Sequence, residues 1–482
     1  MTTFEYAPAP ESRSVVDIAS SYGLFINGEF TEAASGEALK TINPATEEQL
    51  AEVAVAGEAD VENAVKAARR AYERSWGPMS GAERAKYLFR IARLLSERSR
   101  EFAVLETLDN GKPIRESRDV DIPLASAYFF YYAGWADKLD YAGRGAGPRP
   151  HGVAGQVIPW NFPLLMLSWK IAPALAAGNT VVLKPAETTP LTALLFADLV
   201  QQAELPPGVV NILTGAGQTG ADLIAHPDVD KVAFTGSTAV GKQIARGVAG
   251  THKHATLELG GKAANIVFDD APVDQTIEGI VNGIYFNQGQ VCCAGSRLLV
   301  QESIAAEVVD RLKARLGALR VGDPMDKNTD VGAINSAAQL GRITELADAG
   351  DAEGALRWSA PGDLPDKGYW FPPTLFTEVS SAHRIARDEI FGPVLSVLTF
   401  RTPDEAVAKA NNTPYGLSAG VWTEKGSRIL SIADQLRAGV VWANTFNKFD
   451  PTSPFGGYKE SGYGREGGRH GLLPYLIEGG TR

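Results

Sequence analysis

Four short runs of β-branched residues decide the fold class: GVAGQVI at 152–158, TVVLKP at 180–185, VVNILTG at 209–215 and KVAFTG at 231–236. Their length and composition are those of buried strands. Stretches that suit helices, such as residues 190–203, lie between such runs, and alternating strands and helices are typical of a parallel, doubly wound sheet. The sequence therefore predicts an α/β domain built on such a sheet.

A second alternating section follows Gly260. Strands are expected at NIVF (265–268) and RLLVQE (297–302), with helices near 273–286 and 303–319. We expect this section to form a second α/β unit.

The segment before the first unit, from residue 58 to about 139, has a helical pattern instead. Ser80 and Glu83 have the spacing of a capping box ahead of several apolar positions. Gly111 is placed to end the helix that Ser80 begins.

Composition limits the classes of protein that the chain could belong to. Its 482 residues allow about three domains of roughly 150 residues each. Apolar residues make up 44% and charged residues 21%, which excludes a disordered or collagen-like chain. The net charge is -11 and no Lys/Arg-rich run is present, so nucleic acid is not expected as a partner.

Three features bear on the compartment. The two cysteines are adjacent in sequence, cannot form a disulfide framework and favour a reducing environment. The N-terminal residues lack the regions of a signal peptide, and residues 1–21 are expected to be a disordered or extended tail. The longest apolar stretch, 157–177, contains three prolines and Lys170 and matches a membrane span poorly. We expect a cytoplasmic protein with no membrane partner.

The segment YFNQGQVCCAGSR (285–297) holds both thiols, Cys292 and Cys293, among glycines and small residues. A nucleophile needs such an uncrowded loop, and backbone N–H groups at a turn can stabilise a thiolate. The alternative is that a cysteine here is a small buried apolar residue.

Three further segments carry polar residues in unusual surroundings. PWNFP (159–163) restrains the backbone around Asn161 and could aim its amide as a hydrogen-bond donor. LELGGK (257–262) places Glu258 at an apolar strand end, where burial should raise the pKa toward that of a useful general base. FTGSTAVGK (234–242) has the strand–turn–helix layout of a pyrophosphate site, although Thr238 replaces the second glycine of GxGxxG. A turn asparagine, an exposed carboxylate and an ordinary strand–helix turn remain the alternatives.

Read together, these segments resemble the NAD(P)-dependent aldehyde dehydrogenase superfamily, and the match extends from about Leu24 to Tyr475. Eight motifs occur in family order: LFINGEF (24–30), IPWNFPLLM (158–166), KPAE (184–187), FTGS (234–237), ELGGK (258–262), FNQGQVCCAGSR (286–297), EIFGP (389–393) and SPFGGYKESGYGRE (453–466). The resemblance implies a doubly wound NAD-binding domain, an α/β catalytic domain that carries the thiol, and a reduced oligomerisation segment. The implied boundaries are 22–127 and 148–260 for NAD binding, 261–454 for catalysis, and 128–147 with 455–482 for oligomerisation.

The resemblance also assigns catalytic roles. It makes Cys292 the nucleophile that attacks an aldehyde, with Cys293 as a non-catalytic neighbour. The oxyanion of the thiohemiacetal would be held by the Asn161 amide and the Cys292 backbone N–H, and hydride would pass to NAD. Glu258 would activate the water that hydrolyses the thioester, so the product would be a free carboxylate.

The cofactor positions follow from the same match. Lys184 and Glu187 would lie at the adenosine ribose, and a carboxylate at position 187 would repel a 2′-phosphate, which favours NAD over NADP. The complete implied set is Ile158, Trp160, Lys184, Glu187, Gly217, Phe234, Ser237, Glu389 and Phe391.

The substrate pocket is expected to be an apolar, mainly aromatic tunnel, which suits aliphatic or aromatic aldehydes. Its implied lining is Phe162, Met166, Trp169, Phe449 and Phe455. Some of these rings could instead be core packing.

The sequence departs from the family pattern in two places. The stretch between Lys138 and Gly152 is short and Gly/Pro-rich where an oligomerisation hairpin is usual, so strand pairing there is not expected. The C-terminal YLIEGGTR lacks the usual β-branched strand. We therefore expect a homodimer, and the abrupt end also permits a piece of a longer, multi-domain protein.

Two other functions and a metal site fit the sequence less well than an aldehyde dehydrogenase does. A non-catalytic relative would lack the thiol, the amide or the carboxylate, and all three are present. A cofactor-independent thiol esterase could act through Cys292 and Asn161, yet it leaves KPAE and FTGS unexplained. The six histidines show no HExxH pattern, so no metal is expected.

Overall fold

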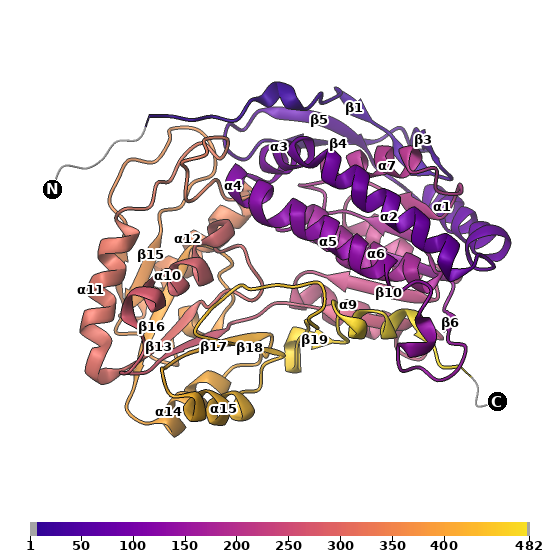
Figure 1. Cartoon of the computed structure of the whole chain (residues 1–482). Helices are drawn as coiled ribbons and strands as arrows, with labels where there is room; N and C mark the ends of the chain where they lie inside the picture. Colours follow the sequence, from indigo (N-terminus) through magenta and orange to yellow (C-terminus); the bar gives the residue numbers. More distant parts are fainter. Residues whose placement is uncertain (1–6, 480–482) are drawn as a thin grey trace.

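The first lobe of the protein is organised around an eight-stranded sheet in a computed structural model that describes residues 7–479 (Figure 1). The four β-branched runs form its centre, where β7 to β11 are all parallel. The predicted doubly wound sheet is therefore confirmed. In spatial order the strands are β19 (Gly462–Tyr463), β11 (His254–Glu258), β10 (Lys231–Thr235), β7 (Val153–Val157), β8 (Thr180–Lys184), β9 (Val210–Ile212), β2 (Leu24–Ile26) and β3 (Glu29–Thr31).

Helices cover both faces of this sheet and bury its apolar side chains. One face carries α1 (Glu58–Ala71), α8 (Gly217–Ala225) and α9 (Thr238–Val248). The other carries α6 (Pro163–Ala177) and α7 (Leu191–Gln202), and the remaining helices pack outside these two. Those outer helices are α2 (Gly81–Glu97), α3 (Ser99–Asn110), α4 (Ile114–Glu116) and α5 (Ile122–Ala133).

The second lobe contains a seven-stranded sheet whose strands are parallel except for β14 at one edge. In spatial order it comprises β14 (Leu356–Ser359), β15 (Thr374–Thr377), β16 (Val394–Phe400), β13 (Arg297–Gln301), β12 (Ala264–Val267), β17 (Ser418–Trp422) and β18 (Val440–Ala443). Its helices are α10 (Val273–Ile284), α11 (Ala305–Leu316), α12 (Ala337–Ala352), α13 (Arg384–Arg387), α14 (Pro403–Asn411) and α15 (Gly426–Gln435). The second α/β unit expected after Gly260 is thus present.

The helical segment between the N-terminus and the first sheet differs in one respect from expectation. Ser80 caps α2 as predicted, because its side chain accepts from the Glu83 N–H. Gly111 ends a separate helix, α3, in a left-handed conformation with φ of 93°. The single helix expected from Ser80 to Gly111 is therefore wrong: the chain leaves regular helix at Arg98, whose ψ is 15°.

Residues 7–21 run along the surface of the protein, so of the two states expected for the tail the extended one describes them. Glu11 is buried, its carboxylate binds Arg100, and its N–H donates to the Met325 carbonyl. The arginine holds the pKa of Glu11 at about 2. The chain then enters a small sheet of β1 (Ser21–Tyr22), β5 (Gln49–Ala54) and β4 (Ala38–Ile42). Residues 1–6 lie outside the described residues.

The short stretch before Gly152 does form a strand, contrary to expectation. Strand β6 (Arg149–Pro150) pairs antiparallel with β20 (Leu476–Ile477) near the C-terminus. The pairing is only two residues long, because glycines at positive φ, such as Gly145 and Gly147, occupy the preceding loop. A partner strand for this stretch therefore comes from the same chain.

Two of the implied domain boundaries can be located on the elements of the structure. Residue 260 separates β11 of the first sheet from β12 of the second. The boundary at residue 127 falls inside α5, whose face from Ile122 to Ala133 packs continuously on α6 and α2. Among residues 7–479, no helix combines the length and apolarity needed to cross a membrane.

Candidate active site

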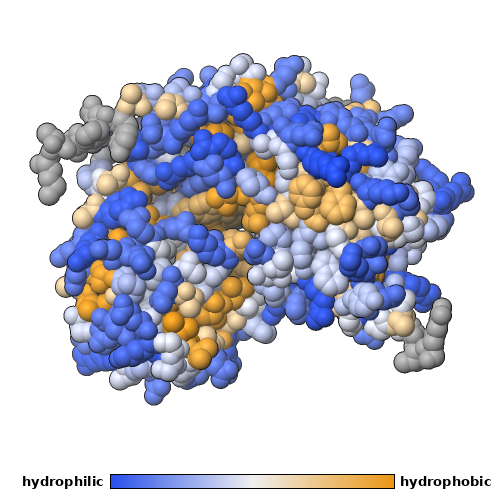
Figure 2. All heavy atoms as spheres, viewed as in Figure 1, coloured by the Kyte–Doolittle hydropathy of each residue, from blue (hydrophilic) through white to orange (hydrophobic). Residues whose placement is uncertain are grey.

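A cavity of about 930 Å³ lies between the carboxyl ends of strands in the first sheet and the amino ends of β13, β16 and β17 in the second. Figure 2 shows a hollow between the two lobes with pale and orange apolar surface inside it and hydrophilic surface around its rim. Cys292, Glu258 and Asn161 all line this cavity. The structure thus brings together three residues that the sequence places on separate segments.

Cys292 lies on the loop between a 3-10 turn at Phe286–Gly289 and strand β13. Asn287 and Gln288 both have positive φ, so the loop is held in an uncommon conformation just before the thiol. Cys292 is partly buried, whereas Cys293 is fully buried. A hydrogen bond with Cys293, followed by burial, raises the pKa of the Cys292 thiol well above its ordinary value. The Cys292 thiol is therefore favoured in its protonated form.

Asn161 lies on the loop that joins β7 to α6, and its amide is held by the thiol loop. Its Nδ2 donates to the Gln290 carbonyl at 2.8 Å, two residues before Cys292. An amide nitrogen carries two hydrogens, and the contacts described for residues 7–479 use one of them. The other hydrogen is available to a ligand in the cavity.

Glu258 is the last residue of β11 and is 4% exposed, as its position in an apolar strand end predicted. Neither carboxyl oxygen has a hydrogen-bond partner among the described residues. Burial, and then the charge of Glu466, raise the pKa of Glu258 well above its ordinary value, which confirms the expected direction. A carboxylate with so high a pKa is a strong base once it is ionised.

Gly260 and Gly261 follow Glu258 because no side chain fits at either position. A Cβ on Gly260 would collide with the Glu389 carboxylate, and one on Gly261 would collide with the Cys292 carbonyl oxygen. Instead, the Gly261 N–H donates to Glu389 at 2.9 Å. The two glycines therefore let the first lobe approach the thiol loop of the second.

The turn from β10 into α9 forms one end of the cavity, and it fits the phosphates of a dinucleotide. The Ser237 hydroxyl caps α9 by accepting from the Val240 N–H at 3.3 Å, and Gly236 to Ala239 line the cavity. The Thr235 hydroxyl is buried there without a hydrogen-bond partner among the described residues. Orphaned polar hydrogens at a helix N-terminus suit an anionic group.

The expected nicotinamide-ribose residues lie on the opposite wall. Glu389 is partly buried, and burial raises its pKa to about 7. Phe391 has a φ of 57° and meets Trp160 edge-on, with ring centroids 5.2 Å apart. All three line the cavity, and Gln339 donates to the Phe391 carbonyl at 2.9 Å. A strained residue held in this way indicates a functional position.

The remaining cofactor positions lie outside this cavity. Lys184 ends β8, and its Nζ is 3.5 Å from the Glu187 carboxylate, whose side chain is 53% exposed. Burial lowers the pKa of Lys184. The other members also sit around the carboxyl ends of these strands: Ile158 after β7, Gly217 at the start of α8 and Phe234 in β10. Ile158, Lys184 and Phe234 are buried, whereas Gly217 and the Glu187 side chain are exposed.

The expected substrate-pocket residues all line the cavity. Trp169 and Phe455 have ring centroids 5.4 Å apart, and Phe449 lies 5.7 Å from Phe455. Phe162 stacks on Phe286 at 6.1 Å. These rings both pack together and face the cavity, so the two alternatives for them are not exclusive.

Two charged residues beside the site were not identified from the sequence. Lys170 is fully buried in α6 and forms an ion pair with Glu466, and Glu466 lines the cavity next to Glu258. The signal was available, since Lys170 is the only charged residue in an otherwise apolar helix. Within residues 7–479, no cluster of three or more metal-binding side chains is present.

Comparisons with known proteins identify the family of this chain. The model of the aldehyde dehydrogenase family matches residues 30–477. A mitochondrial aldehyde dehydrogenase of Rattus norvegicus is 46% identical over 467 residues, which cover 94% of this chain and 89% of that protein.

Two solved structures are similar over nearly the whole chain. The NAD+ complex of an aldehyde dehydrogenase from Bacillus cereus is 45% identical, with a TM-score of 0.92 and 95% of each chain covered. An indole-3-acetaldehyde dehydrogenase in complex with NAD+ is 42% identical, with a TM-score of 0.93 and 96% of each chain covered. The matched motifs, the two-sheet fold and the thiol, amide and carboxyl groups around one cavity together place this chain in the aldehyde dehydrogenase family.

Proposed function

We propose that this chain, an NAD-dependent aldehyde dehydrogenase, binds its aldehyde covalently at Cys292 and releases a free carboxylate. The observation that carries the proposal is the convergence of Cys292, Asn161 and Glu258 on one cavity from both lobes. NAD, when bound, supplies the acceptor for the hydride that leaves the substrate carbon. All other steps are assigned to side chains of this chain.

The first step is attack by the Cys292 sulfur on the aldehyde carbon, after the thiol has given its proton to water in the cavity. A carbon–sulfur bond forms, and the carbonyl π electrons move onto oxygen to give a thiohemiacetal oxyanion. The free hydrogen of the Asn161 amide and the Cys292 backbone N–H are the donors proposed for that oxyanion. Loss of hydride then leaves a thioester on Cys292.

Glu258 is proposed as the base for the second half of the reaction. Its ionised carboxylate removes a proton from water, the hydroxide adds to the thioester carbon, and the carbon–sulfur bond breaks. The raised pKa makes Glu258 basic enough for this task. The products are a carboxylate and the regenerated thiol.

The cofactor is proposed to lie across the carboxyl ends of the first sheet. Lys184 and Glu187 would bind the adenosine ribose, with Ile158, Gly217 and Phe234 beside it. Ser237 and Trp160 would flank the pyrophosphate, and Glu389 and Phe391 would hold the nicotinamide ribose.

The substrate is proposed to be an apolar aldehyde, aliphatic or aromatic. The wall around Trp169, Phe449 and Phe455 is aromatic, and the cavity exposes more apolar than polar surface. One similar solved protein is an indole-3-acetaldehyde dehydrogenase. An aromatic side group on the aldehyde is compatible with such a wall.

The chain is further proposed to work in the cytoplasm, and nucleic acid is not proposed as a partner. Two free thiols suit a reducing compartment. Cell fractionation that recovered the protein from an oxidising compartment would contradict this location.

The nucleophile assignment is tested by a matched pair of variants. Cys292→Ala should abolish NADH formation from an aldehyde and also hydrolysis of p-nitrophenyl acetate, because both need the same sulfur. Cys293→Ala, the control, should keep most of each activity, since that thiol is fully buried and donates to the Asn447 side-chain oxygen at 3.7 Å. Equal losses in the two variants would show that the nucleophile has been misassigned.

The base assignment is tested by Glu258→Gln, which preserves the shape of the side chain and removes its basicity. Hydride transfer should persist while thioester hydrolysis slows, so one burst of NADH per active site is expected, followed by little turnover. Stopped-flow measurement of NADH absorbance follows both phases. A normal steady state would disprove the role.

The ribose assignment is tested by Glu187→Ser. Removing the carboxylate removes its repulsion of a 2′-phosphate, so kcat/KM for NADP should rise relative to that for NAD by roughly ten-fold or more. Steady-state kinetics with each cofactor measure the ratio. An unchanged preference would place Glu187 outside the cofactor site.

The oligomeric state is proposed to be a homodimer, because β6 and β20 pair over only two residues within one chain and offer a short edge for assembly. Light scattering coupled to gel filtration should give about twice the chain mass of 51.3 kDa. A stable mass of four chains would contradict the proposal.

A further inference from the structure

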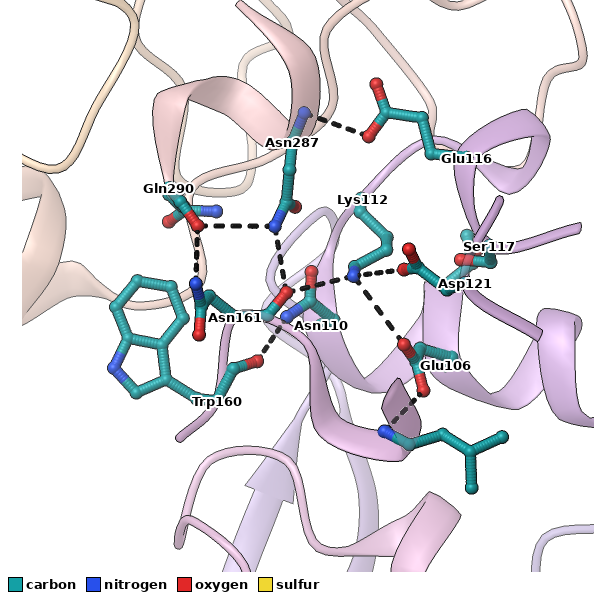
Figure 3. A network of polar contacts seen from close by, with 12 residues as sticks. Glu106, Asn110, Lys112, Glu116, Ser117, Asp121, Trp160, Asn161, Asn287 and Gln290 are labelled. Atoms are coloured by element: carbon teal, nitrogen blue, oxygen red, sulfur yellow. Dashed lines mark hydrogen bonds and ion pairs between the residues drawn. The ribbon is translucent and has the colours of Figure 1, made fainter. Parts of the chain in front are cut away.

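A fully buried lysine lies directly behind the oxyanion donor. Lys112 follows α3, and its Nζ donates to the Asn161 backbone carbonyl at 2.9 Å (Figure 3). Two positions earlier, the Asn110 side chain donates to the Trp160 carbonyl at 2.6 Å. Two consecutive carbonyls of the loop after β7 are therefore held by side chains from the end of α3.

The ammonium of Lys112 is itself fixed by two buried carboxylates. Asp121 Oδ2 lies 2.5 Å from Nζ, and Glu106 Oε1 lies 3.5 Å from it. Asp121 belongs to a π-helical turn at Ser117–Asp121, and such turns often occur at functional sites. An ion pair of this kind, buried on all sides, is costly to form unless its geometry is well satisfied.

The same cluster holds the neighbouring backbone on both sides of Asn161. The second oxygen of Glu106 accepts from the Leu164 N–H at 3.1 Å, in the first turn of α6. The Lys112 ammonium also lies 4.4 Å from the centre of the Phe162 ring. The contacts of this one cluster therefore restrain positions 160 to 164.

The thiol loop supplies a second clamp on the Asn161 carbonyl. Asn287 Nδ2 donates to it at 2.8 Å, and the Asn287 backbone N–H donates to Glu116 at 2.9 Å. Figure 3 shows Lys112 and Asn287 approaching the Asn161 carbonyl from different sides, with Gln290 accepting from the Asn161 amide. The peptide and the side chain of Asn161 are both fixed.

We propose that Lys112, held by Asp121 and Glu106, is a positioning residue that sets the direction of the Asn161 amide toward the oxyanion. Lys112 does not line the cavity; it contacts the Asn161 carbonyl and the ring of the neighbouring Phe162. A donor that is fixed before the reaction needs no reorientation when the negative charge develops. The inference rests on the oxyanion role proposed above for Asn161.

The test is a variant that removes the clamp without leaving a buried charge unpaired. Lys112→Met alone would leave the Asp121 carboxylate buried without a positively charged partner, so Asp121→Asn is introduced with it. Burial already raises the pKa of Glu106 to about 7, so this carboxyl can take up a proton when the lysine is removed. Circular dichroism and gel filtration establish that the paired variant is folded.

The paired variant is expected to lower kcat with propanal by roughly 10- to 100-fold, because a small misplacement of a catalytic donor has effects of that size. Hydrolysis of p-nitrophenyl acetate, which uses the same oxyanion donors without NAD, should fall by a similar factor. The Kd of the enzyme without substrate for NAD should stay within about two-fold of the parent value. Neither Lys112 nor Asp121 is among the residues proposed to bind NAD.

The matched control is Lys231→Met. Lys231 is also a fully buried lysine that donates to a backbone carbonyl, that of Val232, but it begins β10 and does not line the cavity. Its loss should leave kcat within about three-fold of the parent. A drop as large as that of the paired variant would mean that any buried lysine has this effect, which would overturn the inference.

A double-mutant cycle with Asn161→Ala separates positioning from a merely structural role. If Lys112 acts through Asn161, the paired variant should cost less than about two-fold in kcat once the Asn161 amide is absent. An undiminished loss in that background would overturn the inference. If Asn161→Ala alone left kcat unchanged, the oxyanion role of Asn161 would be wrong. If Asn161→Ala lowered kcat but the paired variant did not, only the positioning role of Lys112 would be wrong.

Discussion

Two buried carboxylates on α3 each accept a hydrogen bond from the backbone of a loop that forms the site in the first lobe. Glu106 accepts from the Leu164 N–H at the start of α6, and Asp109 accepts from the Leu191 N–H at the start of α7. Free N–H groups at a helix start need such partners, and a carboxylate is favoured there by the helix dipole. One helix outside the sheet thus fixes both the loop that carries Asn161 and the loop between β8 and α7 that carries Glu187.

The chemistry of the site follows from where two parallel sheets end. The parallel strands of the first sheet place their carboxyl ends at the cavity, and β13, β16 and β17 of the second sheet place their amino ends there. The first sheet brings Glu258 to this junction, and the second brings the thiol loop that precedes β13. Gly260 and Gly261 allow the close approach between the two lobes. A hydrogen bond with Cys293, and then burial, raise the pKa of Cys292, while burial, and then the charge of Glu466, raise that of Glu258. Both the proposed nucleophile and the proposed base are therefore favoured in their uncharged forms.

The sequence was informative wherever local pattern dictates structure. The β-branched runs predicted both sheets, and the apolar strand end around Glu258 predicted its burial and the direction of its pKa shift. It could not predict the Lys112 cluster, because Glu106, Lys112 and Asp121 meet only after α3 ends and the chain turns back through a π-helical turn. It also missed the break at Arg98, since the apolar pattern continues across it.

The chain crosses between the lobes and then returns. After leaving the first sheet at Glu258 and building the second, it adds β19 to the edge of the first sheet beside β11. Further backbone bonds join the lobes, from the Ile114 N–H to the Pro324 carbonyl and from the Ala333 N–H to the Gly111 carbonyl. Two lobes joined by a single linker can move apart by a hinge motion. Lobes that are also joined by strand pairing must break the hydrogen bonds of that pairing to do so. Opening the cavity by a hinge motion between the lobes would therefore require breaking the β11–β19 pairing and these backbone hydrogen bonds.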